Sequence, residues 1–111
     1  MNKWLVRLSW AGLLLTVLLL DTPALARGDG ASLYKVKCAD CHGADGSGNT
    51  AVGKSLKLRD LRSADIQKQP DEELAAVTAN GKGSMPAYKD ELTGDQIRQL
   101  VGFMRQLAKK K

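Results

Sequence analysis

Apolar residues recur at helical spacing along much of the chain. The clearest set lies near the C-terminus, where five apolar residues at i, i+3, i+4, i+7 and i+10 share one helical face: Ile97, Leu100, Val101, Met104 and Leu107. This spacing predicts an amphipathic helix over about 94–108. Thr93 and Gln96 stand just before it with the spacing of a capping box, which favours a helix start at this point.

The segment before residue 70 is expected to contain one helix, a loop and a short helix. The first helix begins at Asp29 or Gly30 and runs into the turn at Cys38. Residues 43–53 are rich in Gly, Ser and Asn, which is typical of a loop. A short helix is expected over about 63–67.

A further helix is expected to start at Pro70, a residue that suits the first helical position. Acidic residues follow in its first turn, where they interact favourably with the helix dipole. Asn80-Gly81 supplies the stop signal. No strand pattern competes with these helices, so the chain is predicted to be all-α, with about four helices.

The stretch Cys38-Ala39-Asp40-Cys41-His42 has the spacing that attaches a c-type haem. On one helical turn, residues i and i+3 share a face, so both thiols can reach the vinyl groups along one edge of a porphyrin. His42 follows directly and is expected to bind the iron as the proximal ligand. Cys38 and Cys41 are therefore the expected covalent attachment points of one haem c.

Three other interpretations of this stretch fit less well. A thioredoxin-like redox pair needs a βαβ context, and no strand-rich run flanks the cysteines. A zinc site needs about four ligands, whereas the chain holds two Cys and one His. A plain disulfide between Cys38 and Cys41 would leave His42 unexplained.

Residues 1–26 resemble a cleaved secretory signal peptide. Lys3 and Arg7 precede an apolar run over 11–20, and Ala24-Leu25-Ala26 has the small–x–small pattern of a cleavage site. An uncleaved membrane anchor is the alternative, but the uncharged run is shorter than the roughly 20 residues that a span needs. We expect export to the periplasm or a thylakoid lumen-like compartment, and no stable membrane anchor after cleavage.

Residues 27–111 are then a single domain. A domain of this size buries only about 60–65% of the surface that its unfolded chain exposes. A buried haem would supply the missing apolar core, as cofactors do in other small scaffolds. We therefore expect the haem-free protein to be largely unfolded.

The net charge of +5 bears on the kind of partner. The chain has no recognition motif for nucleic acid and only 5% aromatic residues, so nucleic acid is not an expected partner. An acidic redox protein, approached by electrostatic steering, fits the positive charge better than nucleic acid does. Ordinary solubilising lysines explain the charge equally well.

The second axial ligand must come from a residue other than histidine, since His42 is the only one. Met104 falls on the apolar face of the last helix, where a methionine more often fills the core. Met85 instead lies in a Gly-rich loop and precedes Pro86, which holds it extended. A thioether suits haem iron, so Met85 is the expected distal ligand, with simple packing of the loop as the alternative.

Four motifs in this order resemble class I monohaem c-type cytochromes of the small bacterial and photosynthetic periplasmic kind. They are Cys38-Ala39-Asp40-Cys41-His42-Gly43, Asp45-Gly46-x-Gly48, Gly81-x-Gly83-x-Met85-Pro86-Ala87 and Leu92-Thr93-x-x-Gln96-Ile97. The resemblance covers nearly all of 28–108 and implies the cytochrome c fold, with helices around one covalently bound haem. It also implies that the first and last helices cross, with Gly30 and Tyr34 against Leu100 and Phe103.

One position departs from the resemblance. Many relatives carry a proline shortly before the leucine that corresponds to Leu61, and its carbonyl accepts the ring N–H of the proximal histidine. Arg59 stands at or near this place. The acceptor of the His42 N–H is therefore left open.

The sequence thus favours an electron-transfer protein and not an enzyme, because His42 and Met85 would fill both axial positions. Its redox partners are expected to bind through a small, transient interface. Two alternatives remain: a haem subunit of a larger redox complex, and an open-site haem enzyme or gas sensor. The second lacks the distal histidine that such a site would use.

Overall fold

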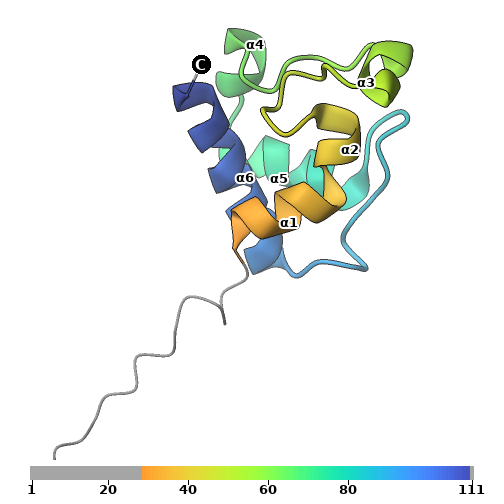
Figure 1. The fold of residues 1–111 in the computed structure, drawn as a ribbon. Coiled ribbons are helices and arrows are strands. Elements are labelled where there is room, and N and C mark those ends of the chain that lie inside the picture. The colour runs from red at the N-terminus through yellow and green to blue at the C-terminus, as the bar shows by residue number, and fades with distance from the viewer. Residues whose placement is uncertain (1–28, 111) are drawn as a thin grey trace, which may run out of the picture.

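The longest helix among the described residues, α6 (Gly94–Lys109), is the element on which α1 (Gly30–Lys37) and α5 (Asp71–Asn80) pack. In the computed structural model, which describes residues 29–110, it runs along one side of the molecule and passes behind α1 (Figure 1). The other helices, in chain order, are α1 (Gly30–Lys37), α2 (Ala39–His42), α3 (Ala51–Leu56), α4 (Ala64–Gln67) and α5 (Asp71–Asn80). The expected signal peptide, 1–26, lies outside the described residues.

The start and the apolar face of α6 match the pattern in the sequence. The Thr93 side chain accepts a hydrogen bond from the Gln96 N–H, and the Gln96 side chain accepts one from the Thr93 N–H, which completes the capping box. Four of the five apolar residues on the face are buried: Ile97, Leu100, Val101 and Leu107. The helix prediction over 94–108 is confirmed to within a residue.

Helix α1 crosses α6 at a glycine. A Cβ at Gly30 would lie 2.4 Å from the carbonyl oxygen of Gln99, so only a residue without a side chain fits at this crossing. One turn later the Tyr34 ring packs on Phe103, with 5.1 Å between the ring centroids. This crossing fixes the orientation of α1, and with it the position of the cysteine motif that follows.

A second cluster joins α4 and α5 to the middle of α6. It contains Ile66, Leu74 and Val101, with Met104 packed against it. In the part of the chain that the structure describes, no large side chain is less than 2% exposed. The protein side chains alone therefore build only a thin core.

The all-α prediction is confirmed, since the described residues contain helices and one isolated bridge, Lys82 with Met85. The described residues contain six helical segments where about four were expected, because the single turn α2 and the short helix α3 were not predicted as separate helices. Between 29 and 110 the structure contains no helix of the length and apolar character needed to cross a membrane.

Two local predictions were wrong. Residues 51–53 are not loop but the first half of α3, which Thr50 caps by accepting a hydrogen bond from the Gly53 N–H. Gly53 is required there because a Cβ would lie 2.2 Å from the Gly48 carbonyl oxygen. Pro70 is the residue before α5 and not its first helical residue.

Candidate functional site

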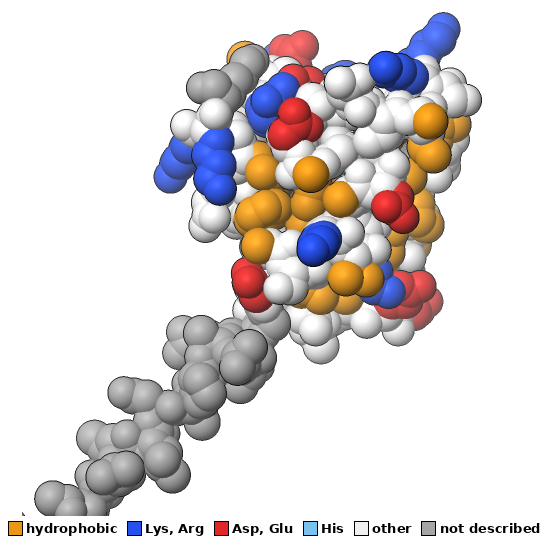
Figure 2. Space-filling view, viewed as in Figure 1, with side chains coloured by type: hydrophobic (Ala, Val, Ile, Leu, Met, Phe, Trp, Pro, Cys, Tyr) orange, Lys and Arg blue, Asp and Glu red, His pale blue; other side chains and the backbone are white. Residues whose placement is uncertain are grey.

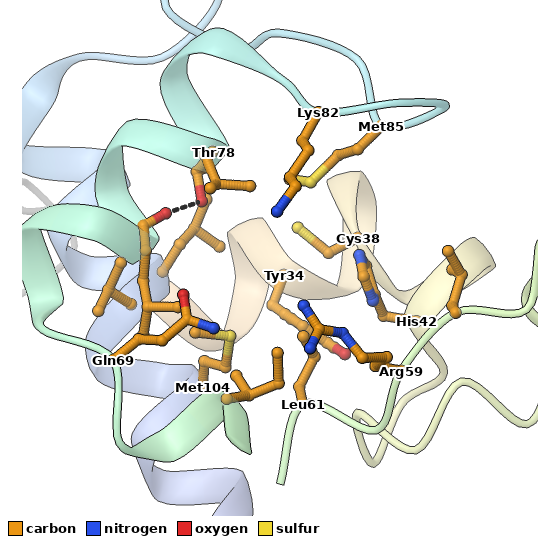
Figure 3. A pocket seen from close by; sticks show the side chains of 16 residues that line it. Tyr34, Cys38, His42, Arg59, Leu61, Gln69, Thr78, Lys82, Met85 and Met104 are labelled. Carbon is orange, nitrogen blue, oxygen red and sulfur yellow. Dashed lines mark hydrogen bonds between the residues drawn. The ribbon is translucent and has the colours of Figure 1, made fainter. Parts of the chain in front are cut away.

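A cavity of about 220 Å³ lies between α1, α2, α5, α6 and the loops 57–61 and 81–87. Protein interiors rarely contain voids much larger than a water molecule, so a cavity of this size is built to hold something. Three of the four residues predicted to hold haem line it: Cys38, His42 and Met85. Figure 3 shows their side chains pointing into the same space from separate segments.

Cys41, the fourth, does not line the cavity. It is half-buried on α2, directly before His42. The two cysteines do not form a disulfide with each other. Burial, and then the neighbouring Cys41, raise the pKa of the Cys38 thiol to about 11. Redox-active Cys-x-x-Cys pairs depend on a lowered thiol pKa, so this environment argues against a thioredoxin-like pair.

The backbone after Cys38 is held by hydrogen bonds from other segments. The Thr50 hydroxyl donates to the Cys41 carbonyl at 2.7 Å, and the Gly48 N–H donates to the His42 carbonyl at 2.7 Å. The carbonyls at a helix end have no partner within their own helix. For α2, these partners come from the loop 43–50, which folds back onto the helix end. The bonds fix the single helical turn that carries the motif.

Tyr34 supplies a third bond to this turn. Its hydroxyl donates to the Gly43 carbonyl at 2.7 Å, and the bond is buried. Burial raises the pKa of Tyr34 well above its usual value, so the hydroxyl stays a donor throughout the physiological range. The residue therefore serves both the crossing of α1 with α6 and the geometry of the motif.

His42 is half-buried, and burial lowers the pKa of its imidazole. The ring is therefore held neutral, which is the form that binds a metal. Its Nδ1 atom is buried and has no hydrogen-bond partner among the described residues. Arg59 lines the cavity together with His42.

Met85 reaches the cavity from the loop that follows α5 (Figure 3). Inside the loop, Lys82 and Met85 exchange two backbone hydrogen bonds, of 3.2 and 2.9 Å. Gly81 has φ 77°, and a Cβ there would lie 2.6 Å from the Met85 carbonyl oxygen. The tight turn at Gly81 therefore sets the direction in which Met85 enters.

Met104 also lines the cavity, at the side formed by α6. It packs against the cluster of Ile66, Leu74 and Val101, which is the core position expected for it from the sequence. The two methionines therefore reach the cavity differently: Met104 from a packed helix, and Met85 from a loop.

The residues present fit a haem. The lining is mostly apolar, as a porphyrin requires, with sulfur and imidazole groups directed into it. Arg59 and Lys82 supply the positive charge in the lining, and Figure 3 shows both side chains reaching into the cavity. Cationic groups there suit the two carboxylates that a haem carries.

Sequence reasoning missed the hydroxyl groups that support the site, those of Thr50, Tyr34 and Tyr88. The Tyr88 hydroxyl donates to the Lys37 carbonyl at 3.0 Å, across 51 residues of sequence. Tyr34 was noted for its place in the helix crossing, but its bond to Gly43 was not. No local pattern encodes such pairings, because each depends on how distant segments pack.

Three comparisons bear on the family. Residues 26–104 match the family model described as cytochrome C oxidase, cbb3-type, subunit III. The chain is 36% identical to the cytochrome c6 of Leptolyngbya boryana, over 73% of this chain and 92% of that protein. It is 33% identical to a cytochrome c6 of Nostoc sp., over 84% and 83% of the two chains.

A solved structure, the KustC0563 c-type cytochrome, shares the fold with a TM-score of 0.67 and 33% identity. The match covers 72% of this chain and 98% of that one. The cavity, the motif at 38–42 and these similarities all indicate a c-type cytochrome. The chain belongs to the small monohaem class I c-type cytochromes: it is an electron carrier with one covalently bound haem c, and not an enzyme.

Proposed function

We propose that Cys38 and Cys41 hold the haem by two thioether bonds, and that His42 and Met85 bind its iron from opposite sides. The observation that carries this proposal is the shared cavity, into which Cys38, His42 and Met85 all point. When bound, haem c supplies an iron that alternates between the ferric and ferrous states. The residues of the chain fix its position and exclude other ligands.

Each group has a separate task. The thioethers fix one edge of the haem to the turn that Thr50 and Gly48 hold in place. Neutral His42 and the Met85 thioether fill both axial positions, which keeps water and substrates from the iron. Little then has to rearrange when the electron moves.

The apolar residues of α5 and α6 surround the buried part of the haem in this proposal. Among the residues of α5 and α6 that line the cavity, Leu74, Leu100 and Val101 are buried. Apolar surroundings and a methionine ligand both favour a raised reduction potential.

Carbon monoxide binding tests this ligation. With both axial positions filled, the untreated ferrous protein should bind carbon monoxide slowly or not at all. Met85→Ala opens one position and should bind it rapidly, which makes this variant the positive control. Rapid binding by the unaltered protein would contradict the proposal and favour an open-site haem protein.

We infer that residues 1–26 are removed on export and that 27–111 form the working domain in the periplasm or a similar compartment. The mass of the protein purified from its native host tests this directly. A mature N-terminus at Arg27 is expected. A mass that includes residues 1–26 would show that the segment is retained as an anchor.

The redox partners are proposed to bind through a small, transient surface with an acidic counterpart. Figure 2 shows apolar side chains gathered over the centre of one face, with basic and acidic side chains dispersed around them. Lys35 and Lys82 are exposed, whereas the neighbouring Lys37 forms an ion pair with Glu91 at 3.0 Å. Lys35 and Lys82 are therefore the better candidates.

A second candidate function is that of a haem subunit in a larger redox complex. It is favoured by the name of the matching family model, which describes an oxidase subunit. Purification without detergent distinguishes the two. A monomer that elutes alone supports the free carrier, and co-elution with a stable complex supports the subunit.

A further inference from the structure

Tyr88 connects the Met85 loop to the haem-attachment motif. Its hydroxyl donates to the carbonyl of Lys37 at 3.0 Å. Lys37 is the last residue of α1 and directly precedes Cys38. This carbonyl lies at a helix end, where it has no partner within its own helix.

The backbone of Tyr88 is fixed on another helix. Its N–H donates to the carbonyls of Thr78 and Ala79 near the end of α5, at 3.1 Å each. Tyr88 therefore stands where the Met85 loop returns to α5, with its side chain extended to α1. The loop 81–87 runs between these two anchors, Gly81 and Tyr88 (Figure 1, light blue).

The hydroxyl and the ring of Tyr88 have separate roles. The ring packs at the edge of the cluster around Leu92 and Leu100, and phenylalanine would keep that packing. Only the hydroxyl reaches the attachment motif. A Tyr88→Phe variant therefore removes one defined contact between the two sides of the cavity.

We propose that Tyr88 is a positioning residue whose hydroxyl holds the Met85 loop closed against the haem-attachment turn. This inference rests on the proposed ligation by Met85. When Met85 leaves the iron, the loop moves away and the bond to Lys37 breaks. The bond therefore stabilises the closed state alone, and its loss shifts the population toward the open state.

Imidazole binding to the ferric protein measures this equilibrium, because imidazole can bind the iron only after Met85 has left. Its apparent affinity is proportional to the population of the open state. Loss of this one exposed hydrogen bond should therefore tighten imidazole binding about two- to fivefold in Tyr88→Phe. The titration is followed by absorbance on the complete haem protein.

Thr93→Ala is the control. It removes the cap of α6 and lowers the stability of the fold, but it leaves both anchors of the loop in place. Imidazole affinity should stay at the value of the unaltered protein. If Tyr88 only stabilised the fold, Tyr88→Phe and Thr93→Ala would have the same effect on imidazole affinity.

The outcomes separate the two proposals. Equal imidazole affinity in Tyr88→Phe and the unaltered protein would overturn the role of Tyr88 alone. Tightening of the same size in Thr93→Ala would also overturn it. If the unaltered ferric protein lacks the sulfur–iron absorption band that imidazole should abolish, both the ligation by Met85 and the role of Tyr88 fail.

Discussion

The two sides of the haem cavity are built in different ways. On the attachment side, the carbonyls of Cys41, His42 and Gly43 accept hydrogen bonds from two other segments, the loop 43–50 and helix α1. On the other side, the Met85 loop has one pair of internal bonds, between Lys82 and Met85, and is otherwise anchored at its ends.

This difference matches the bonds that each side is proposed to make with the haem. Covalent thioethers need two side chains in one fixed geometry, and the attachment turn supplies it. A coordinate bond to Met85 can break and re-form, and a loop whose two ends stay attached to α5 through the backbone N–H groups of Gly81 and Tyr88 allows this without unfolding the helices. Stability should therefore depend mainly on the attachment side, and ligand exchange on the loop.

The largest expected effect follows from removal of both thioethers. Cys38→Ser/Cys41→Ser should contain no covalent haem, and haem-free material should be largely unfolded because the protein side chains build only a thin core. Far-ultraviolet circular dichroism during heating measures this. A cooperative, native-like melt of haem-free protein would show that the helices need no haem.

Gly30→Ala tests the crossing that orients the attachment side. The new Cβ would meet the Gln99 carbonyl at 2.4 Å, and we expect a loss of about 1–3 kcal/mol in the free energy of unfolding. Gly102→Ala is the matched control, since nothing lies within 4 Å of its Cβ. It should stabilise α6 by about 0.5–1 kcal/mol. Urea unfolding of both haem-loaded variants measures the two free energies of unfolding. Equal changes in Gly30→Ala and Gly102→Ala would contradict the close packing at Gly30.

Tyr34→Phe and Tyr88→Phe compare the two sides by the same chemical change. Tyr34→Phe removes a buried hydrogen bond to the Gly43 carbonyl, which then keeps only the Gly46 N–H as a donor, and this should cost about 1.5 kcal/mol of stability. The Tyr88 bond is exposed to water, so its loss should cost about 1 kcal/mol or less. Urea unfolding with the haem in place measures both. A larger loss for Tyr88→Phe would reverse the comparison.

The helices and the attachment motif could be predicted from the sequence because both are local patterns. The apolar period of α6 and its capping box are complete within one stretch of chain. Helix α3 was missed because Gly53 suggests a loop, although that glycine is present for close approach to the Gly48 carbonyl. Composition does not distinguish these two uses of glycine.

The supporting contacts of the site could not be predicted. The bonds of Tyr34 and Tyr88 join residues 9 and 51 positions apart, and they exist only once the helices have packed. Met85 could be proposed as an iron ligand from the sequence because a methionine before proline in a Gly-rich loop has no evident packing role. Its anchors at Gly81 and Tyr88 appear only in the fold.

The central claim is that Met85 binds the haem iron as its second axial ligand, whereas Met104 fills the core. The absorption spectrum of the ferric protein tests this claim most directly. Met85→Leu should abolish the ferric absorption band typical of sulfur–iron ligation, because leucine has no ligand atom. Met104→Leu keeps a similar apolar volume and should leave the band intact. Loss of the band in Met104→Leu and its retention in Met85→Leu would contradict the account.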